Sequence, residues 1–138
     1  MEDFKVWVEK AQENALKLCS NEINICAHVW FDQEDELYLA HCLEFDIVAE
    51  GYTEKEAEKN ILKAIVNHIV FCVANGNVEK IMNPAPREYW CKFYFNSKPL
   101  REPFRFTENY TYGNLKLPFL HNFISTVEFN KSVSHAKA

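Results

Sequence analysis

The side chains best suited to chemistry in this sequence are histidines and cysteines. His68 and Cys72 lie four residues apart, a spacing that places both on one face of a helix, where they could share a metal ion. Structural zinc takes four ligands at characteristic spacings, and the sequence contains no Cys-x-x-Cys and no His-x3-His pair. We therefore expect buried free thiols and a hydrogen-bonded core histidine, with no metal ion and no cofactor. The same expectation applies to four residues on neighbouring predicted strands, namely Cys26, His28, His41 and Cys42.

Carboxylates are the second set of side chains that could carry out chemistry. A two-metal nuclease of the RNase H type needs several Asp or Glu side chains that converge on two metal ions. One of these carboxylates lies in the middle of the first strand. The predicted first strand, Ile23–Phe31, contains none. The sequence also lacks a Gly-x-Ser-x-Gly elbow and a glycine-rich phosphate loop. We therefore predict no catalytic residue, and a metal-dependent nuclease is kept only as a remote alternative.

The acidic residues gather instead in the loop that follows the first strand: Asp32, Glu34, Asp35 and Glu36. Two interpretations stay open for this loop. It could dock electrostatically on a basic partner, or it could be the solvated tip of a hairpin.

The elements that must position these groups are organised around one long helix, between Gly51 and Gly76. Thr53 and Glu56 form a capping box, in which the Thr53 hydroxyl accepts from the Glu56 N–H and the Glu56 carboxylate is expected to reach the Thr53 N–H. Asn75 and Gly76 suit the left-handed backbone that ends a helix.

This helix carries two apolar stripes at helical spacing. The first comprises Ala57, Ile61, Ala64, Ile65, His68 and Cys72. The second comprises Leu62, Val66, Ile69 and Val73. One sheet face needs only one stripe, so we expect the second to be covered by the C-terminal segment or by another subunit. It is the predicted interface of a homo-oligomer, most simply a dimer.

The remaining patterns predict an α+β domain: a three-strand antiparallel meander, the long helix and a returning strand, with helices on one sheet face. An amphipathic helix over Asp3–Leu18 precedes the meander. The strands expected are Ile23–Phe31, Leu37–Cys42, Phe45–Glu50 and the aromatic Glu88–Phe95.

We divide the chain into an N-terminal helix (1–20), a central domain (21–96) and an irregular C-terminal extension (97–138). The extension is assigned either to the same core or to an oligomer interface. Within it, Phe104–Phe106 is a candidate short strand, and Pro118–Asn130 fits a helix or a strand equally well. The polar residues from Asn130 to Ala138 are expected to fray.

Length, composition and net charge limit the classes of function that this protein could have. A chain of 138 residues with 48% hydrophobic residues can bury one core. We expect no membrane span and no signal peptide, which favours the cytoplasm. A net charge of -5 argues against direct nucleic-acid binding, because phosphate contacts need clustered Lys and Arg.

The segment Tyr38–Ala57, YLAHCLEFDIVAEGYTEKEA, resembles the HicB-like antitoxin family. It combines an alternating strand, a corner at Cys42 and a Gly-x-Thr-x-x-Glu-Ala entry to a helix over Gly51–Ala57. The resemblance extends from about Ile23 to Phe95. It implies a partial RNase H-like fold without nuclease chemistry, and a role in binding and neutralising a small basic RNA-cleaving toxin of the HicA type, often as a dimer or tetramer. Many members append a DNA-binding domain, and the proline-broken C-terminal segment shows no pair of helices that would form one.

The function expected is therefore that of a non-catalytic protein-binding module. The alternative is a structural or interaction protein of the same fold that has no toxin partner.

Overall fold

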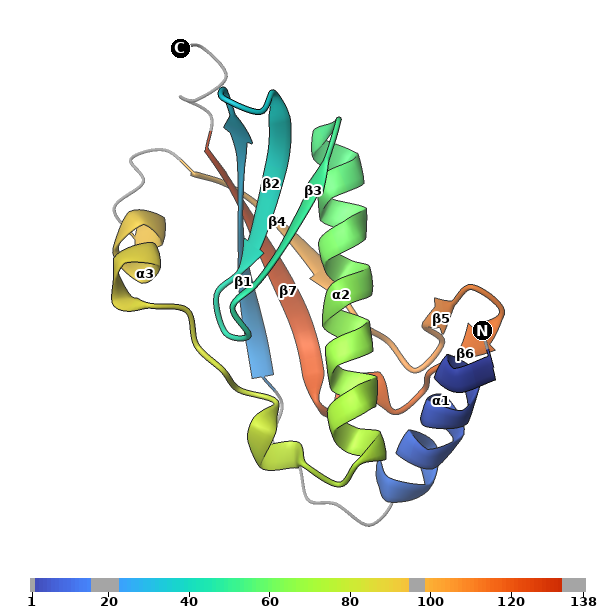
Figure 1. The fold of residues 1–138 in the computed structure, drawn as a ribbon. Coiled ribbons are helices and arrows are strands. Elements are labelled where there is room, and N and C mark those ends of the chain that lie inside the picture. The colour runs from blue at the N-terminus through green and yellow to red at the C-terminus, as the bar shows by residue number, and fades with distance from the viewer. Residues whose placement is uncertain (1, 16–22, 95–98, 133–138) are drawn as a thin grey trace.

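A computed structural model describes residues 2–15, 23–94 and 99–132 (Figure 1). Five strands form one mixed sheet in the order β3-β2-β1-β7-β4. In chain order the elements are α1 (Glu2–Ala15), β1 (Ile23–Asp32), β2 (Leu37–Cys42), β3 (Ile47–Gly51), α2 (Glu54–Ala74), the 3-10 turn η1 (Val78–Lys80), α3 (Arg87–Tyr94), β4 (Pro99–Arg105), β5 (Thr111–Tyr112), β6 (Leu115–Lys116), the 3-10 turn η2 (Leu120–Asn122) and β7 (Ile124–Ser132). The predicted α+β class is confirmed.

The first three strands form the predicted antiparallel meander. β1 pairs with β2 from Ala27↔Cys42 to Asp32↔Leu37, and β2 pairs with β3. Alternate residues of β1 are buried as the sequence indicates, with Ile25 and Val29 facing α2. β3 begins at Ile47, two residues later than expected.

The start of β3 shifts because Phe45 is drawn into the core. The corner between β2 and β3 buries its ring, which is only 2% exposed. The next residue, Asp46, turns the chain in the left-handed region, with φ 54. Phe45 therefore packs on the His68 ring, at a centroid distance of 4.7 Å, instead of extending the strand.

The capping box at the start of α2 is present with one change. The Glu56 N–H donates to Thr53 Oγ1 at 3.1 Å, as predicted. The reciprocal bond to the Glu56 carboxylate comes from the Tyr52 N–H at 2.9 Å rather than from Thr53. At the other end of the helix, Gly76 adopts the expected left-handed backbone with φ 70.

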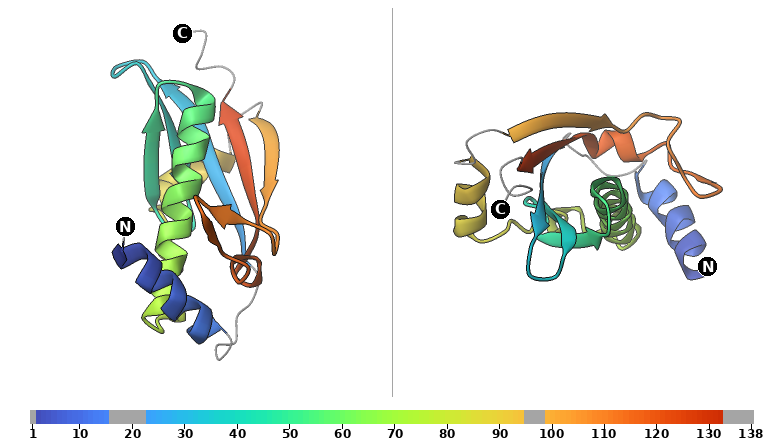
Figure 2. Two further views of the ribbon diagram at one scale, coloured as in Figure 1. Left: turned by 90° about the vertical axis from the view of Figure 1, so that its right-hand side faces the viewer. Right: turned by 90° about the horizontal axis from the view of Figure 1, so that it is seen from above.

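Most residues of both apolar stripes of α2 are buried within one chain, and Leu62, Ala64 and His68 are half-buried. α1 packs beside α2 and contributes Val8 and Ala11 to the core (Figure 2). The Asn14 side-chain amide donates to the carbonyl oxygens of Val73 and Ala74 at 2.9 and 3.0 Å, which satisfies two acceptors at the helix end.

The predicted oligomer interface is accordingly wrong for three of its four residues. Val66, Ile69 and Val73 are fully buried in the single chain, because α1 and the C-terminal segment cover them, and only Leu62 stays partly exposed. α1 ends at Ala15, and the residues to Leu18 lie outside the described part of the chain.

The segment predicted as the aromatic strand Glu88–Phe95 is instead helix α3, so this prediction is wrong. α3 packs on the sheet face opposite α2, where Trp90 and Phe93 meet Leu43 and Cys26 (Figure 1). The helices therefore lie on both faces, contrary to the expectation of one.

The returning strand is β7, which lies parallel to β1 from Ile23↔Ile124 to Val29↔Lys131. β4 then pairs antiparallel with β7 and forms the sheet edge. The ambiguous stretch Pro118–Asn130 thus resolves into the turn η2 followed by β7, and Asn130 and Lys131 are buried strand residues rather than a frayed end.

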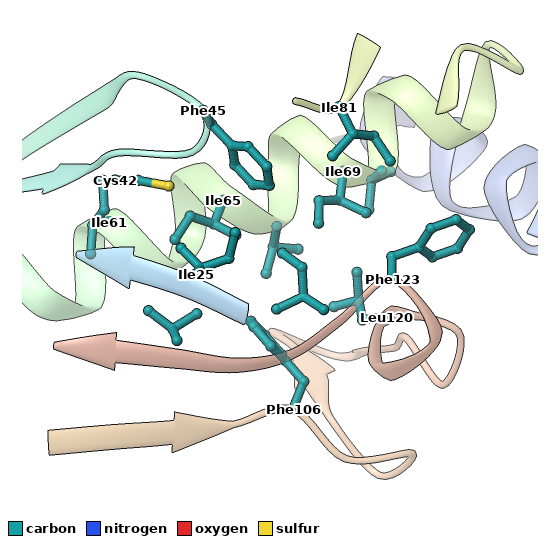
Figure 3. Close-up of a cluster of buried hydrophobic side chains, with 14 of the residues drawn as sticks. Ile25, Cys42, Phe45, Ile61, Ile65, Ile69, Ile81, Phe106, Leu120 and Phe123 are labelled. Carbon is teal, nitrogen blue, oxygen red and sulfur yellow. The ribbon is translucent and has the colours of Figure 1, made fainter. Parts of the chain in front are cut away.

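The C-terminal segment is therefore part of the central sheet and of its core. Figure 3 shows Phe106, Leu120 and Phe123 packed with Ile25, Ile65 and Ile69 from the central domain.

Candidate protein-binding site

The acidic loop forms a tight turn at the free end of the β1–β2 hairpin (Figure 1). Glu34, Asp35 and Glu36 are exposed, and Asp32 is half-buried. The Asp32 Oδ1 accepts the Glu34 N–H at 3.3 Å, and Glu36 adopts the left-handed conformation that closes the turn, with φ 56. Within the described part of the chain, none of these four carboxylates has a basic partner. Among the described residues, the turn is thus a compact negative surface without an ion-pair partner.

An exposed aromatic side chain lies at the same end of the sheet. The register pairs Gly51, the residue before Tyr52, with Tyr38, which lies two residues after the turn. The Tyr52 side chain is 80% exposed, more than any other large hydrophobic residue described. A tyrosine beside charged residues is a frequent anchor in protein interfaces. Sequence analysis missed Tyr52, although its position between Gly51 and the helix cap was visible.

The start of α2 adds charge to this end of the molecule. Glu56 holds the Tyr52 N–H, and Glu54 lies 3.1 Å from the Lys131 ammonium, so both carboxylates are engaged. Lys55 offsets part of the charge, and its ammonium lies 3.7 Å from Glu58. The four turn carboxylates and Tyr52 therefore form the candidate site, which we call the acidic end.

The two strand histidines and Cys26 lie on the α3 side of the sheet, whereas Cys42 lies in the core beneath α2. His28 and His41 are cross-strand neighbours on the face that α3 covers. His41 is buried, its Nε2 lies 2.8 Å from Asp46 Oδ1, and its ring meets Tyr89 of α3 edge-on at 4.9 Å. The His28 ring lies edge-on to the Phe93 ring, at a centroid distance of 6.0 Å.

His68 is a hydrogen-bonded core histidine, as predicted. Its Nε2–H donates to the Ile81 carbonyl at 2.7 Å. Cys72 Sγ lies 4.0 Å from the same nitrogen, so the two side chains do share a helix face. Among the residues that the structure describes, no three His, Cys, Asp or Glu side chains are placed to hold a metal ion.

The thiols differ in their surroundings. Burial raises the pKa of Cys42 to about 12, and burial also raises the pKa of Cys72. Cys91 on α3 is exposed. Cys42 and Cys72 are the buried free thiols that the sequence indicates.

No described helix is both long enough and apolar enough to span a bilayer. Comparison of the chain with protein-family models, with curated proteins and with solved structures gave no match.

Proposed function

We propose that this protein is a non-catalytic binding module that docks a small basic protein on its acidic end. The observation that carries the proposal is the uncompensated turn of Asp32, Glu34, Asp35 and Glu36 next to the exposed Tyr52. Negative charge steers a basic partner to the surface, and an aromatic side chain supplies buried contact area.

The identity of the partner follows from the resemblance of Tyr38–Ala57 to HicB-like antitoxins. The meander followed by α2 supports this assignment, and the strand parallel to β1 that a partial RNase H-like fold requires is supplied by β7, beyond the segment that carries the resemblance. We therefore propose a HicA-type RNA-cleaving toxin as the partner, which the module neutralises. The interior of β1 supplies no carboxylate for two-metal chemistry, which disfavours the nuclease alternative.

The test is inhibition of RNA cleavage by a purified HicA-type toxin. The wild-type chain is expected to block cleavage. The Glu34→Lys/Asp35→Lys variant is expected to inhibit about tenfold or more weakly, because it puts positive charge against a basic partner. Glu9→Lys/Glu13→Lys, on exposed positions of α1, makes the same change in net charge away from the site and should inhibit like the wild type.

Equal inhibition by the turn variant and its control would refute the acidic end as the docking site. Absence of both binding and inhibition would favour the alternative, an interaction protein of this fold without a toxin partner.

We also propose that the chain forms a homodimer, through a patch different from the one that the sequence indicated. Val6, Trp7 and Phe71 are 56%, 38% and 47% exposed where α1 meets α2, and the two aromatic rings meet edge-on at 5.0 Å. Sedimentation equilibrium should give a dimer for the wild type and a monomer for Trp7→Gln/Phe71→Gln. A wild-type monomer would refute the dimer.

A further inference from the structure

A groove runs along α2, between the helix and the segment from β4 to β6. Two adjoining hollows of about 260 and 340 Å³ make it up, and both are lined by Lys59, Leu62 and Phe104. Figure 2 shows α2 and this C-terminal segment side by side.

One wall of the groove is a row of lysines. Lys55, Lys59 and Lys63 all line it, at a spacing of four residues along α2. Because a helix rises 1.5 Å per residue, successive ammonium groups are rooted about 6 Å apart. Within the described residues, Lys59 and Lys63 form no ion pair. Glu58, the acidic residue in the lining, is held by the buried Lys131 at 2.8 Å.

The floor of the groove is apolar and aromatic, and its rings are already packed on one another. Tyr110 lies edge-on to Phe104 and to Phe106, at 6.2 and 4.8 Å, and Tyr112 meets Phe4 at 4.9 Å. A ring face that takes part in one of these contacts is not free to stack on another ring. Nucleic-acid bases need free aromatic faces to stack on, so this floor suits peptide side chains better than bases.

We propose that this groove binds an extended acidic peptide in which carboxylates alternate with apolar side chains. In an extended chain, side chains on one side repeat every two residues, or about 6.6 Å, which matches the lysine spacing of about 6 Å. The carboxylates then face the lysine row, and the intervening apolar side chains meet Leu62 and Phe104. The charge complementarity selects an acidic ligand, whereas the acidic end selects a basic one.

The test uses an end-blocked, fluorescein-labelled peptide, Glu-Phe-Glu-Leu-Glu-Phe, with fluorescence anisotropy on the full chain. A peptide of the same composition with its three glutamates contiguous is the register control. Lys59→Ala/Lys63→Ala is expected to weaken binding by about fivefold, because two exposed ion pairs are lost. Lys10→Ala/Lys80→Ala, exposed lysines elsewhere, should bind like the wild type. Binding should also weaken between about 50 and about 500 mM salt.

Four results would overturn the proposal: no peptide binding, equal affinity for the two peptides, no loss in the Lys59→Ala/Lys63→Ala variant, or tighter binding of a labelled hexauridylate than of the alternating peptide. A wild-type dimer that this lysine variant dissociates would overturn it too, since the occupant would then be a second copy. The lysine variant keeps the acidic turn, so toxin inhibition reports separately on the proposed function.

Discussion

Glu44 occupies a costly position for a carboxylate, in the corner between β2 and β3. Glu44 is only 7% exposed, and its Oε1 accepts a hydrogen bond from the Cys26 N–H at 2.8 Å. The backbone around it is equally engaged, since the Asn83 N–H donates to the Glu44 carbonyl at 2.9 Å. Burial disfavours the charged form and raises the pKa of Glu44 above its ordinary value.

The pH dependence of stability at this residue has a definite sign. Because the folded-state pKa is raised, the folded state binds a proton more tightly than the unfolded state between the two pKa values. The contribution of Glu44 to stability is therefore complete below its ordinary pKa and is lost as pH rises through the folded-state value. Glu44→Gln keeps an acceptor for Cys26 but does not titrate.

We expect the free energy of unfolding of Glu44→Gln, relative to wild type, to increase between about pH 4 and about pH 7. Urea denaturation across this range measures the difference. A difference that stays flat or falls with pH would contradict the assignment.

Lys131 is the second residue whose charge is buried. Its side chain is 6% exposed, and its ammonium lies 2.8 Å from Glu58 Oε2 and 3.1 Å from Glu54 Oε1. The buried Glu58 oxygen has no other hydrogen-bonding partner, so this ammonium is what compensates it. The contact ties the end of β7 to the start of α2.

Lys131→Met is expected to destabilise the protein by about 3 kcal/mol, because it leaves the buried Glu58 carboxylate with only the longer Lys55 contact at 3.7 Å. Lys131→Met/Glu58→Leu should recover most of that loss, since both charges are then gone. Chemical denaturation of both variants measures the two effects. A double variant no more stable than the single one would show that the pair is not coupled.

At the scale of the element, α2 shows how a short local signal fixes a boundary. The Thr53 hydroxyl accepts the Glu56 N–H of the first turn, which has no intrahelical partner, and the Glu56 carboxylate accepts the N–H of Tyr52, the residue before the cap. Both residues are visible in the sequence, and the helix begins at Glu54 as their positions predict.

Thr53→Ala removes the acceptor for the Glu56 N–H and should lower the free energy of unfolding by about 1 kcal/mol. Thr111→Ala, an exposed strand threonine, is the matched control and should change it by less than about 0.5 kcal/mol. Thermal unfolding followed by circular dichroism compares the two. Equal effects would mean that the cap does not contribute.

α3 shows where local propensity fails. Aromatic density over 88–95 favours a strand, yet the same residues place Trp90 and Phe93 three apart on one helix face, against Leu43. The Tyr89 N–H donates to the Pro86 carbonyl at 3.0 Å, which starts the helical turn. Packing on the free face of the meander decides between strand and helix. The residues contacted there, such as Leu43, lie forty or more positions away in the chain.

β4 illustrates how the sheet edge is controlled. It forms one edge of the sheet, and Pro99 and Pro103 lie within it. Proline has no N–H, so it weakens the edge as a template for another strand. An added peptide is therefore better accommodated in the lysine-lined groove than along this strand.

At the scale of the whole molecule, the meander, the long helix and their core faces were predictable, because each is encoded by residues close in sequence. The central position of β7 was not, because its parallel pairing with β1 joins residues about a hundred positions apart. The acidic turn was located correctly, whereas the lysine-lined groove depends on that long-range assembly.

A chain that ends at Asn96 is expected not to unfold cooperatively. It would lack β7, which lies between β1 and β4, and core side chains such as Phe106, Leu117 and Val127. Thermal denaturation and the dispersion of amide signals in NMR measure this against the full chain. A folded 1–96 fragment would show that the meander and α2 are an independent unit.

The location of β7 also sets the order of events during folding. The hairpin of β1 and β2 and the helix α2 close through local contacts, but one side of β1 stays unpaired until residues 124–132 arrive. Entry of β7 into that slot closes the largest loop in the sheet, so we infer that it is the late, slow step. Until it occurs, an apolar strand edge is open to neighbouring chains, and a nascent chain would be most vulnerable to aggregation in that interval.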